Sequence, residues 1–171
     1  MPTLIEIKAR CRNPEHLRRI LRENNADFKG IDRQKDTYFR VRHGRLKLRE
    51  GNIENHLIHY FRPDQSGPKK SEVLLYKSTP GSTLKSLLTA ADGMLTVVDK
   101  EREIYFIENV KFHIDTVRDL GSFAEIEAID RDGSIPEAEL LRQCEYYLDL
   151  FGIEEQDLVK NSYSDMLLMK S

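Results

Sequence analysis

The sequence has little of several features that would assign a protein to a common class. It holds two cysteines, Cys11 and Cys144, with no CxxC pair and no histidine-rich motif, which excludes a disulfide framework and a cysteine-ligated zinc site. No stretch approaches the roughly twenty apolar residues of a membrane-spanning helix, and the opening residues MPTLIEIKAR lack the apolar core of a signal peptide. We therefore expect a reduced, cytoplasmic protein with no membrane partner.

Neither sign of charge is in clear excess. The chain has 27 lysines and arginines against 29 aspartates and glutamates, a net charge of -2, so its composition gives no general attraction to nucleic acid, and we expect none as a partner. A Walker A loop, a dinucleotide-binding glycine fingerprint, HExxH and a Gly-x-Ser-x-Gly elbow are also missing. Any phosphate chemistry must therefore come from the local placement of charged side chains.

The 171 residues fit a single domain, residues 1–171, large enough to bury its own core. Alternating polar and apolar residues predict strands at 3–10, 35–42, 45–49, 56–62, 72–77, 96–107, 110–117 and 123–129. Helical spacing predicts helices at 14–24, after Pro80, at 136–151 and at 154–160, with an extended tail at 163–168. The predicted fold class is α+β: an eight-stranded, mostly antiparallel, closed or nearly closed β-barrel with helices packed outside.

The polar faces of these strands separate the two signs of charge. Basic side chains gather on three segments and acidic ones on two others: Lys8, Lys47 with Arg49 and Lys100 with Arg102, against Asp115 and Glu125 with Glu127. A solvated sheet also carries charge opposite its apolar face, but such segregation is unusual there. If the faces converge, lysine and arginine would neutralise phosphoryl oxygens and carboxylates would hold Mg²⁺ or Mn²⁺. Such a site suits phosphoryl or nucleotidyl transfer.

Short motifs occur in an order that matches one known family. They are Glu6-Ile7-Lys8, similar to the second half of E-x-E-x-K; Asp36-Thr37-Tyr38; Leu46-Lys47-Leu48-Arg49, similar to L-R-x-R; Lys100-Glu101-Arg102; His113-Ile114-Asp115 with Glu125-Ile126-Glu127; and the ending at 162–165. Together they resemble the CYTH family, named for class IV adenylate cyclase and thiamine triphosphatase and also called triphosphate tunnel metalloenzymes. The K-x-R pair and the ending resemble the class IV adenylate cyclase branch. Leu4 stands where the family has its first glutamate, so one expected metal ligand is missing, which Asp115 or Asp36 would have to replace.

The resemblance implies a metal-dependent site for a triphosphate. By it, the catalytic residues would be Glu6, Lys8, Glu125 and Glu127; the triphosphate would contact Lys8, Lys47, Arg49, Arg62, Lys100, Arg102 and Tyr38; and Mg²⁺ or Mn²⁺ would be held by Glu6, Asp115, Glu125 and Glu127. Tyr38 would hold substrate or a metal-bound water, or its ring would only fill the barrel. Lys160 and Tyr163 could close one end of the tunnel. The family also suggests a homodimer.

Three functions are compatible with these residues. The first is an adenylate cyclase that converts ATP to cyclic AMP and pyrophosphate; the second is a hydrolase of inorganic or organic triphosphates, including thiamine triphosphate; the third is a non-catalytic module that binds nucleotide or polyphosphate. The same charges would serve all three, because substrate position decides the reaction. His56, His59 and His113 are expected to be hydrogen-bonded or surface histidines, since no two of them are spaced for one metal site.

Overall fold

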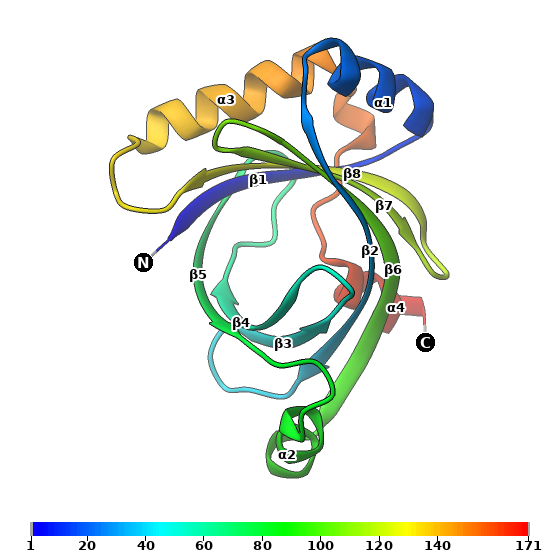
Figure 1. Ribbon diagram of the computed structural model, residues 1–171, viewed down its shortest axis with the longest axis vertical. Coiled ribbons are helices and arrows are strands. Elements are labelled where there is room, and N and C mark those ends of the chain that lie inside the picture. Colours follow the sequence, from blue (N-terminus) through cyan, green and yellow to red (C-terminus); the bar gives the residue numbers. More distant parts are fainter. Residues whose placement is uncertain (1, 171) are drawn as a thin grey trace.

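The computed structural model describes residues 2–170, which form a closed antiparallel β-barrel. Its strands are β1 (Thr3–Arg10), β2 (Asp27–Phe39), β3 (Arg45–Glu50), β4 (Asn55–Phe61), β5 (Lys69–Lys77), β6 (Met94–Ile107), β7 (Val110–Val117) and β8 (Gly121–Asp130). Around the barrel they follow the order β1-β5-β4-β3-β2-β6-β7-β8, and Figure 1 looks nearly along the lumen. The eight-stranded barrel expected from the sequence is thereby confirmed.

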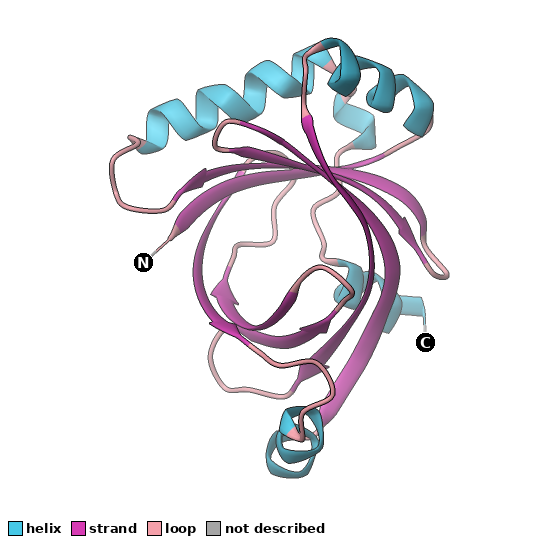
Figure 2. Cartoon of the chain, in the orientation of Figure 1, coloured by secondary structure: helices cyan, strands magenta, loops and turns pink. Residues whose placement is uncertain are grey.

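The helices lie outside the barrel, as the colouring in Figure 2 makes clear. They are α1 (Pro14–Glu23), α2 (Leu84–Asp92), α3 (Glu137–Leu150) and α4 (Tyr163–Lys170), with a short 3-10 turn at Glu155–Asp157. The helix α3 packs on β8 and β1, α2 contacts β2, and α4 contacts β6. Asn13 starts α1 because its side chain accepts a hydrogen bond from the amide of His16 at 3.2 Å.

Two apolar clusters stabilise the barrel from opposite sides of its wall. Outside, the apolar faces of β1, β7 and β8 pack against α1 and α3 through side chains that include Ile7, Phe112, Ile126 and Leu140. Each such side chain contributes about 1.5–3 kcal/mol when fully buried. Inside, a second cluster contains Phe123 and Tyr163 together with Tyr60 and Val73 of β4 and β5. Because side chains alternate along a strand, burying one face of β1 and β8 outside directs their charged residues into the lumen.

Some predicted boundaries are wrong, for local physical reasons. The tail at 163–168 is the helix α4, not an extended segment, because Ser162 accepts a hydrogen bond from the amide of Asp165 at 3.2 Å and caps it. The strand predicted at 35–42 is β2, which ends at Phe39 and begins at Asp27. Its first half has polar residues inside the barrel and a bulge at Gly30, which hides the alternation. The helix predicted at 154–160 is only the 3-10 turn, and the strand predicted at 72–77 is β5, which already starts at Lys69.

Candidate active site in the barrel lumen

The lumen holds a cavity of about 290 Å³ to which all eight strands contribute side chains. Ten of the residues expected at the site line this cavity: Glu6, Lys8, Tyr38, Lys47, Arg49, Arg62, Lys100, Arg102, Glu125 and Glu127. Nine of them lie on strands far apart in the sequence, and strand alternation points them to one space, while Arg62 directly follows β4. Asp115, the remaining expected residue, is fully buried behind the cavity wall.

A basic cluster is arranged around the buried carboxylate of Asp36. Arg49 donates two hydrogen bonds to it, at 2.9 and 2.8 Å, and the amine of Lys100 lies 2.8 Å away. The amine of Lys47 is 3.6 Å from the same carboxylate. Burial acts to raise the pKa of Asp36, but these three cations outweigh it and hold that pKa well below its ordinary value. The cations are thus fixed in place by an internal anion.

Burial and crowding among cations also lower lysine pKa values in this cluster. Burial, reinforced by Arg102 and Arg49 and opposed by Asp36, lowers the pKa of Lys100 to about 7. At Lys8, burial together with Arg62 outweighs the carboxylate of Glu125 and lowers the pKa to about 8. A polyanion in the lumen would favour the protonated form of both amines.

Arg102 connects the basic cluster to the acidic side of the lumen. Its guanidinium donates two hydrogen bonds of 2.8 Å to Asp115 and one of 3.0 Å to Glu125. The hydroxyl of Tyr163, at the start of α4, donates to Asp115 at 2.7 Å. Asp115 is therefore engaged by Arg102 and Tyr163, and its carboxylate orients the arginine that faces the cavity.

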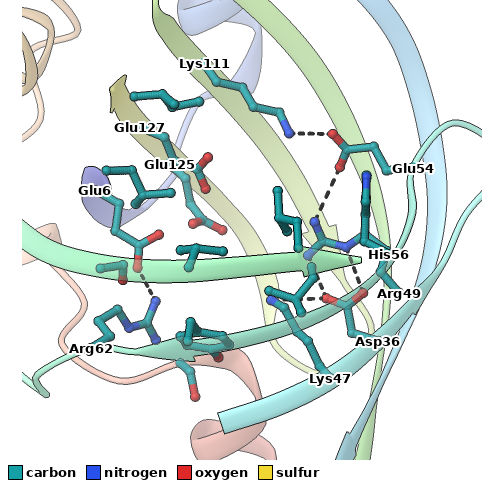
Figure 3. Close-up of a pocket in the computed structure, with 18 of the residues that line it drawn as sticks. Glu6, Asp36, Lys47, Arg49, Glu54, His56, Arg62, Lys111, Glu125 and Glu127 are labelled. Carbon is teal, nitrogen blue, oxygen red and sulfur yellow. Dashed lines mark hydrogen bonds and ion pairs between the residues drawn. The ribbon is translucent and has the colours of Figure 1, made fainter. Parts of the chain in front are cut away.

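Three carboxylates form the acidic side. Glu6 on β1 lies opposite Glu127 on β8, and Lys8 lies opposite Glu125. Figure 3 shows Glu125 and Glu127 side by side, with Glu6 forming an ion pair with Arg62. Burial, together with Glu6 and Glu125, raises the pKa of Glu127 to about 7 against the influence of Lys111. For Glu125, Lys8 and Arg102 outweigh burial and hold the pKa well below its ordinary value.

The acidic side suits a divalent cation. Carboxylate oxygens are the preferred ligands of Mg²⁺ and also bind Mn²⁺. Glu125, Glu127 and His113 each offer a ligand atom, and these atoms lie within 4.8 Å of one another. Neither ring nitrogen of His113 has a hydrogen-bond partner within the described chain. A cation bound here would offset the burial and the carboxylate repulsion that raise the pKa of Glu127, and it would supply Lewis-acid chemistry beside the basic cluster.

Sequence reasoning missed Glu54, which lies in the turn between β3 and β4. Its carboxylate accepts from Lys111 at 2.5 Å and from Arg49 at 3.3 Å, as the dashed lines in Figure 3 indicate. Lys111 and Arg49 outweigh burial and lower its pKa to about 2. The turn is held by Asp32, which accepts from the amides of Ile53 and Glu54 at 2.9 Å each. A turn residue has no periodicity, so no sequence pattern could have placed it in the lumen.

The opposite wall of the cavity carries no lysine, arginine or carboxylate among its lining residues and is largely apolar, which was also not predicted. The cavity-lining residues of β4 and β5 are His56, Ile58, Tyr60, Ser71, Val73 and Leu75. Next to them, Leu4 on β1 lies opposite Ile129 on β8, and both line the cavity. The lumen is therefore two-sided, with charges on one arc and an apolar surface on the other. Such a surface suits an organic group more than a bare polyphosphate.

A closed barrel whose lumen joins a basic cluster to a carboxylate cluster defines a class of anion-binding tunnel proteins. This chain belongs to the CYTH family: the model of the CYTH domain matches residues 3–163. Members of this family bind triphosphates and generally depend on divalent metals. A comparison with curated proteins finds no match. No helix in the described part of the chain is long and apolar enough to cross a membrane.

Solved structures share this fold over nearly the whole chain. The PH1012 protein of Pyrococcus horikoshii OT3 is 26% identical, with a TM-score of 0.78, covering 95% of this chain and 98% of its own. A proposed adenylate cyclase from Vibrio parahaemolyticus is 17% identical, with a TM-score of 0.73 and coverage of 96% and 97%. A protein from Hippeastrum, first proposed as an adenylyl cyclase and described as mainly a triphosphatase, is 15% identical, with a TM-score of 0.61 and coverage of 98% and 95%. At these identities the last two show the fold alone.

Proposed function

We propose that this protein is a divalent-metal-dependent enzyme that takes an organic triphosphate into its tunnel, and that it acts on ATP as a class IV adenylate cyclase, forming cyclic AMP and pyrophosphate. The observation that carries this proposal is the order of side chains along β1 and β8. The apolar pair Leu4 and Ile129 comes first, the acidic pair Glu6 and Glu127 next, and Lys8 with Glu125 follows.

This order favours one orientation of a nucleoside triphosphate. Its base and sugar would lie on the apolar surface by Leu4 and Ile129, where β4 and β5 add Val73 and Leu75. Its outer phosphoryl groups would reach the basic cluster with Lys100 and the neighbouring cations. The carboxylates lie between these two regions, so a metal held by them would act near the phosphorus nearest the sugar, the α-phosphorus.

Cyclisation uses that position directly. The ribose 3′-oxygen forms a bond to the α-phosphorus, the bond from that phosphorus to the bridging oxygen breaks, pyrophosphate leaves, and the hydroxyl proton passes to water. Lys47, Lys100 and Arg102 would neutralise the charge that develops on the departing pyrophosphate. A metal, when bound, lowers the pKa of the attacking hydroxyl and screens the phosphoryl charge. Glu125 and Glu127 would hold it, with Glu6 beside them.

Hydrolysis is the second candidate, and one observation favours it. Two further basic side chains line the cavity: Arg131 directly follows the end of β8, beyond Ile129, and Lys111 lies opposite Glu127. A triphosphate displaced toward them would present its terminal phosphorus, with water as nucleophile, to the same carboxylates. The product would then be orthophosphate.

The test is to incubate the protein with Mg²⁺ or Mn²⁺ and ATP, GTP, thiamine triphosphate or inorganic triphosphate, while following cyclic nucleotide, pyrophosphate and orthophosphate together. Glu127→Gln is the variant expected to lose turnover, and Glu101→Gln, whose side chain is exposed on β6, is the matched control. Cyclic AMP with pyrophosphate would support the cyclase, and orthophosphate the hydrolase. Tight binding with no product from any substrate would refute an enzyme and leave a binding module.

A further inference from the structure

The side chain of His113 is buried in the barrel without a partner. It lies on β7 opposite Glu125 of β8, and only 1% of it is exposed. Both of its ring nitrogens are unpaired within residues 2–170. Burying a polar group without a hydrogen bond is unfavourable, so an orphaned imidazole in a folded interior calls for a ligand. The expectation of a hydrogen-bonded or surface histidine is therefore wrong for His113.

The neighbours of this ring are carboxylates. Its Nδ1 lies 3.9 Å from Oε1 of Glu127, which is too long for a hydrogen bond. With Glu125 included, the three ligand atoms fall within 4.8 Å of one another. Ligand atoms about 2.1 Å from one octahedral cation are separated by roughly 3–4 Å. A small contraction of the three side chains around one ion would satisfy both the imidazole and the carboxylates.

The other acidic groups of the lumen are already engaged. Asp115 is bound by Arg102 and Tyr163, and Glu6 by Arg62. Leu4 offers no oxygen.

We propose that His113 is a ligand of the divalent metal, together with Glu125 and Glu127, and that its nitrogen makes the tunnel select Mn²⁺ over Mg²⁺. The imidazole nitrogen of His113 would serve as the ligand in place of the motif's first glutamate, because β1 has Leu4 at that position. Mg²⁺ is bound almost entirely by oxygen, whereas Mn²⁺, a first-row transition ion that also binds carboxylates, accepts an imidazole nitrogen more readily than Mg²⁺ does. This inference rests on one part of the proposed function, namely that a divalent metal binds in the tunnel.

The experiment measures metal binding without turnover. Mn²⁺ is titrated into the substrate-free protein and its electron paramagnetic resonance is recorded, with electron spin echo modulation to detect coupling to ¹⁴N. Protein labelled with ¹⁵N-histidine identifies the coupled nucleus. The variant is His113→Gln, and the matched control is His56→Gln, because His56 also lines the cavity. Thermal unfolding of both variants verifies that they remain folded.

We expect ¹⁴N coupling in the wild type and in His56→Gln, and none in His113→Gln. The Mn²⁺ dissociation constant should rise at least tenfold in His113→Gln, with a smaller change for Mg²⁺. Bound Mn²⁺ without nitrogen coupling, or unchanged affinity in folded His113→Gln, would overturn the inference, and turnover would still uphold the proposed function. Nitrogen-coupled Mn²⁺ in a protein that converts no triphosphate would uphold the site and overturn the proposed function.

Discussion

Replacing Asp36 by asparagine removes the negative charge that holds the basic cluster together while nearly preserving the side chain's shape. In the wild type this carboxylate is paired with Arg49 and Lys100 at 2.8–2.9 Å and with Lys47 at 3.6 Å. In Asp36→Asn those cations lose their counter-ion, although Arg49 can still donate to the amide oxygen. The variant should therefore be less stable without substrate and should bind a polyanion more tightly.

Both magnitudes follow from the geometry. Removing one partner of a buried ion pair costs about 3–5 kcal/mol, and the retained hydrogen bond favours the lower value. In a chain of this size 1 kcal/mol shifts the melting temperature by about 2–4 °C, so we expect a decrease of roughly 10 °C. A unit charge at about 6 Å contributes about 3 kcal/mol at an effective dielectric constant of 20. Since solvent screening reduces this value, the expected gain in triphosphate affinity is about tenfold.

The assay is thermal unfolding with and without inorganic triphosphate in EDTA, supported by calorimetric dissociation constants. Asp32→Asn is the matched control, because Asp32 is equally buried but accepts from backbone amides and Gln34 instead of cations. The control should lose stability without gaining affinity. If Asp36→Asn melts lower but binds triphosphate no better than the wild type, Asp36 does not compete with the ligand, and the reasoning is refuted.

Three further outcomes are expected. Tyr163→Phe removes the 2.7 Å hydrogen bond to Asp115 and should cost about 1.5–3 kcal/mol in denaturant unfolding, since the acceptor is charged; an unchanged midpoint would contradict the role given to this hydroxyl. Triphosphate binding in EDTA should take up protons at pH 8 and not at pH 6. The reason is that Lys100 and Lys8 have pKa values of about 7 and 8, and a bound anion raises both pKa values. Calorimetry in buffers of different ionisation heat measures the uptake, and equal binding heats at pH 8 would disprove it. Leu4→Glu adds a carboxylate beside the acidic pair and should tighten Mg²⁺ binding about tenfold; weaker or equal binding in a titration would place the metal elsewhere.

Much of the barrel could be predicted from the sequence, because the outward faces of β1, β7 and β8 are buried under helices. On β1 and β8 the alternation of Ile5, Ile7, Ala124 and Ile126 with charged residues fixes both the strand and its register. The first half of β2 was missed, because Asp32 and other polar residues face inward there and Gly30 introduces a bulge. The helix α4 was not predicted, because its start depends on the cap formed by Ser162, which the alternation of polar and apolar residues does not reveal.

The candidate site was predictable where a residue acts through its position on a strand. Lys100 and Arg102, or Glu125 and Glu127, reach the lumen simply by alternation. What the sequence could not reveal is which charges engage each other across the barrel. Hydrogen bonds from Arg102 engage Asp115, whereas the ring nitrogens of His113 have no hydrogen-bond partner in the described residues and are free to bind a metal. These contacts depend on tertiary geometry between strands that are distant in the sequence.

The central claim is that the tunnel binds an organic triphosphate in one orientation, and a crystal structure with Mn²⁺ and a non-hydrolysable ATP analogue tests it most directly. The account predicts outer phosphoryl groups among Lys47, Lys100 and Arg102, the metal at Glu125 and Glu127, and adenine near Leu4. An analogue bound outside the barrel, or one with its base among Lys47, Lys100 and Arg102 and its outer phosphoryl groups near Leu4, would contradict it.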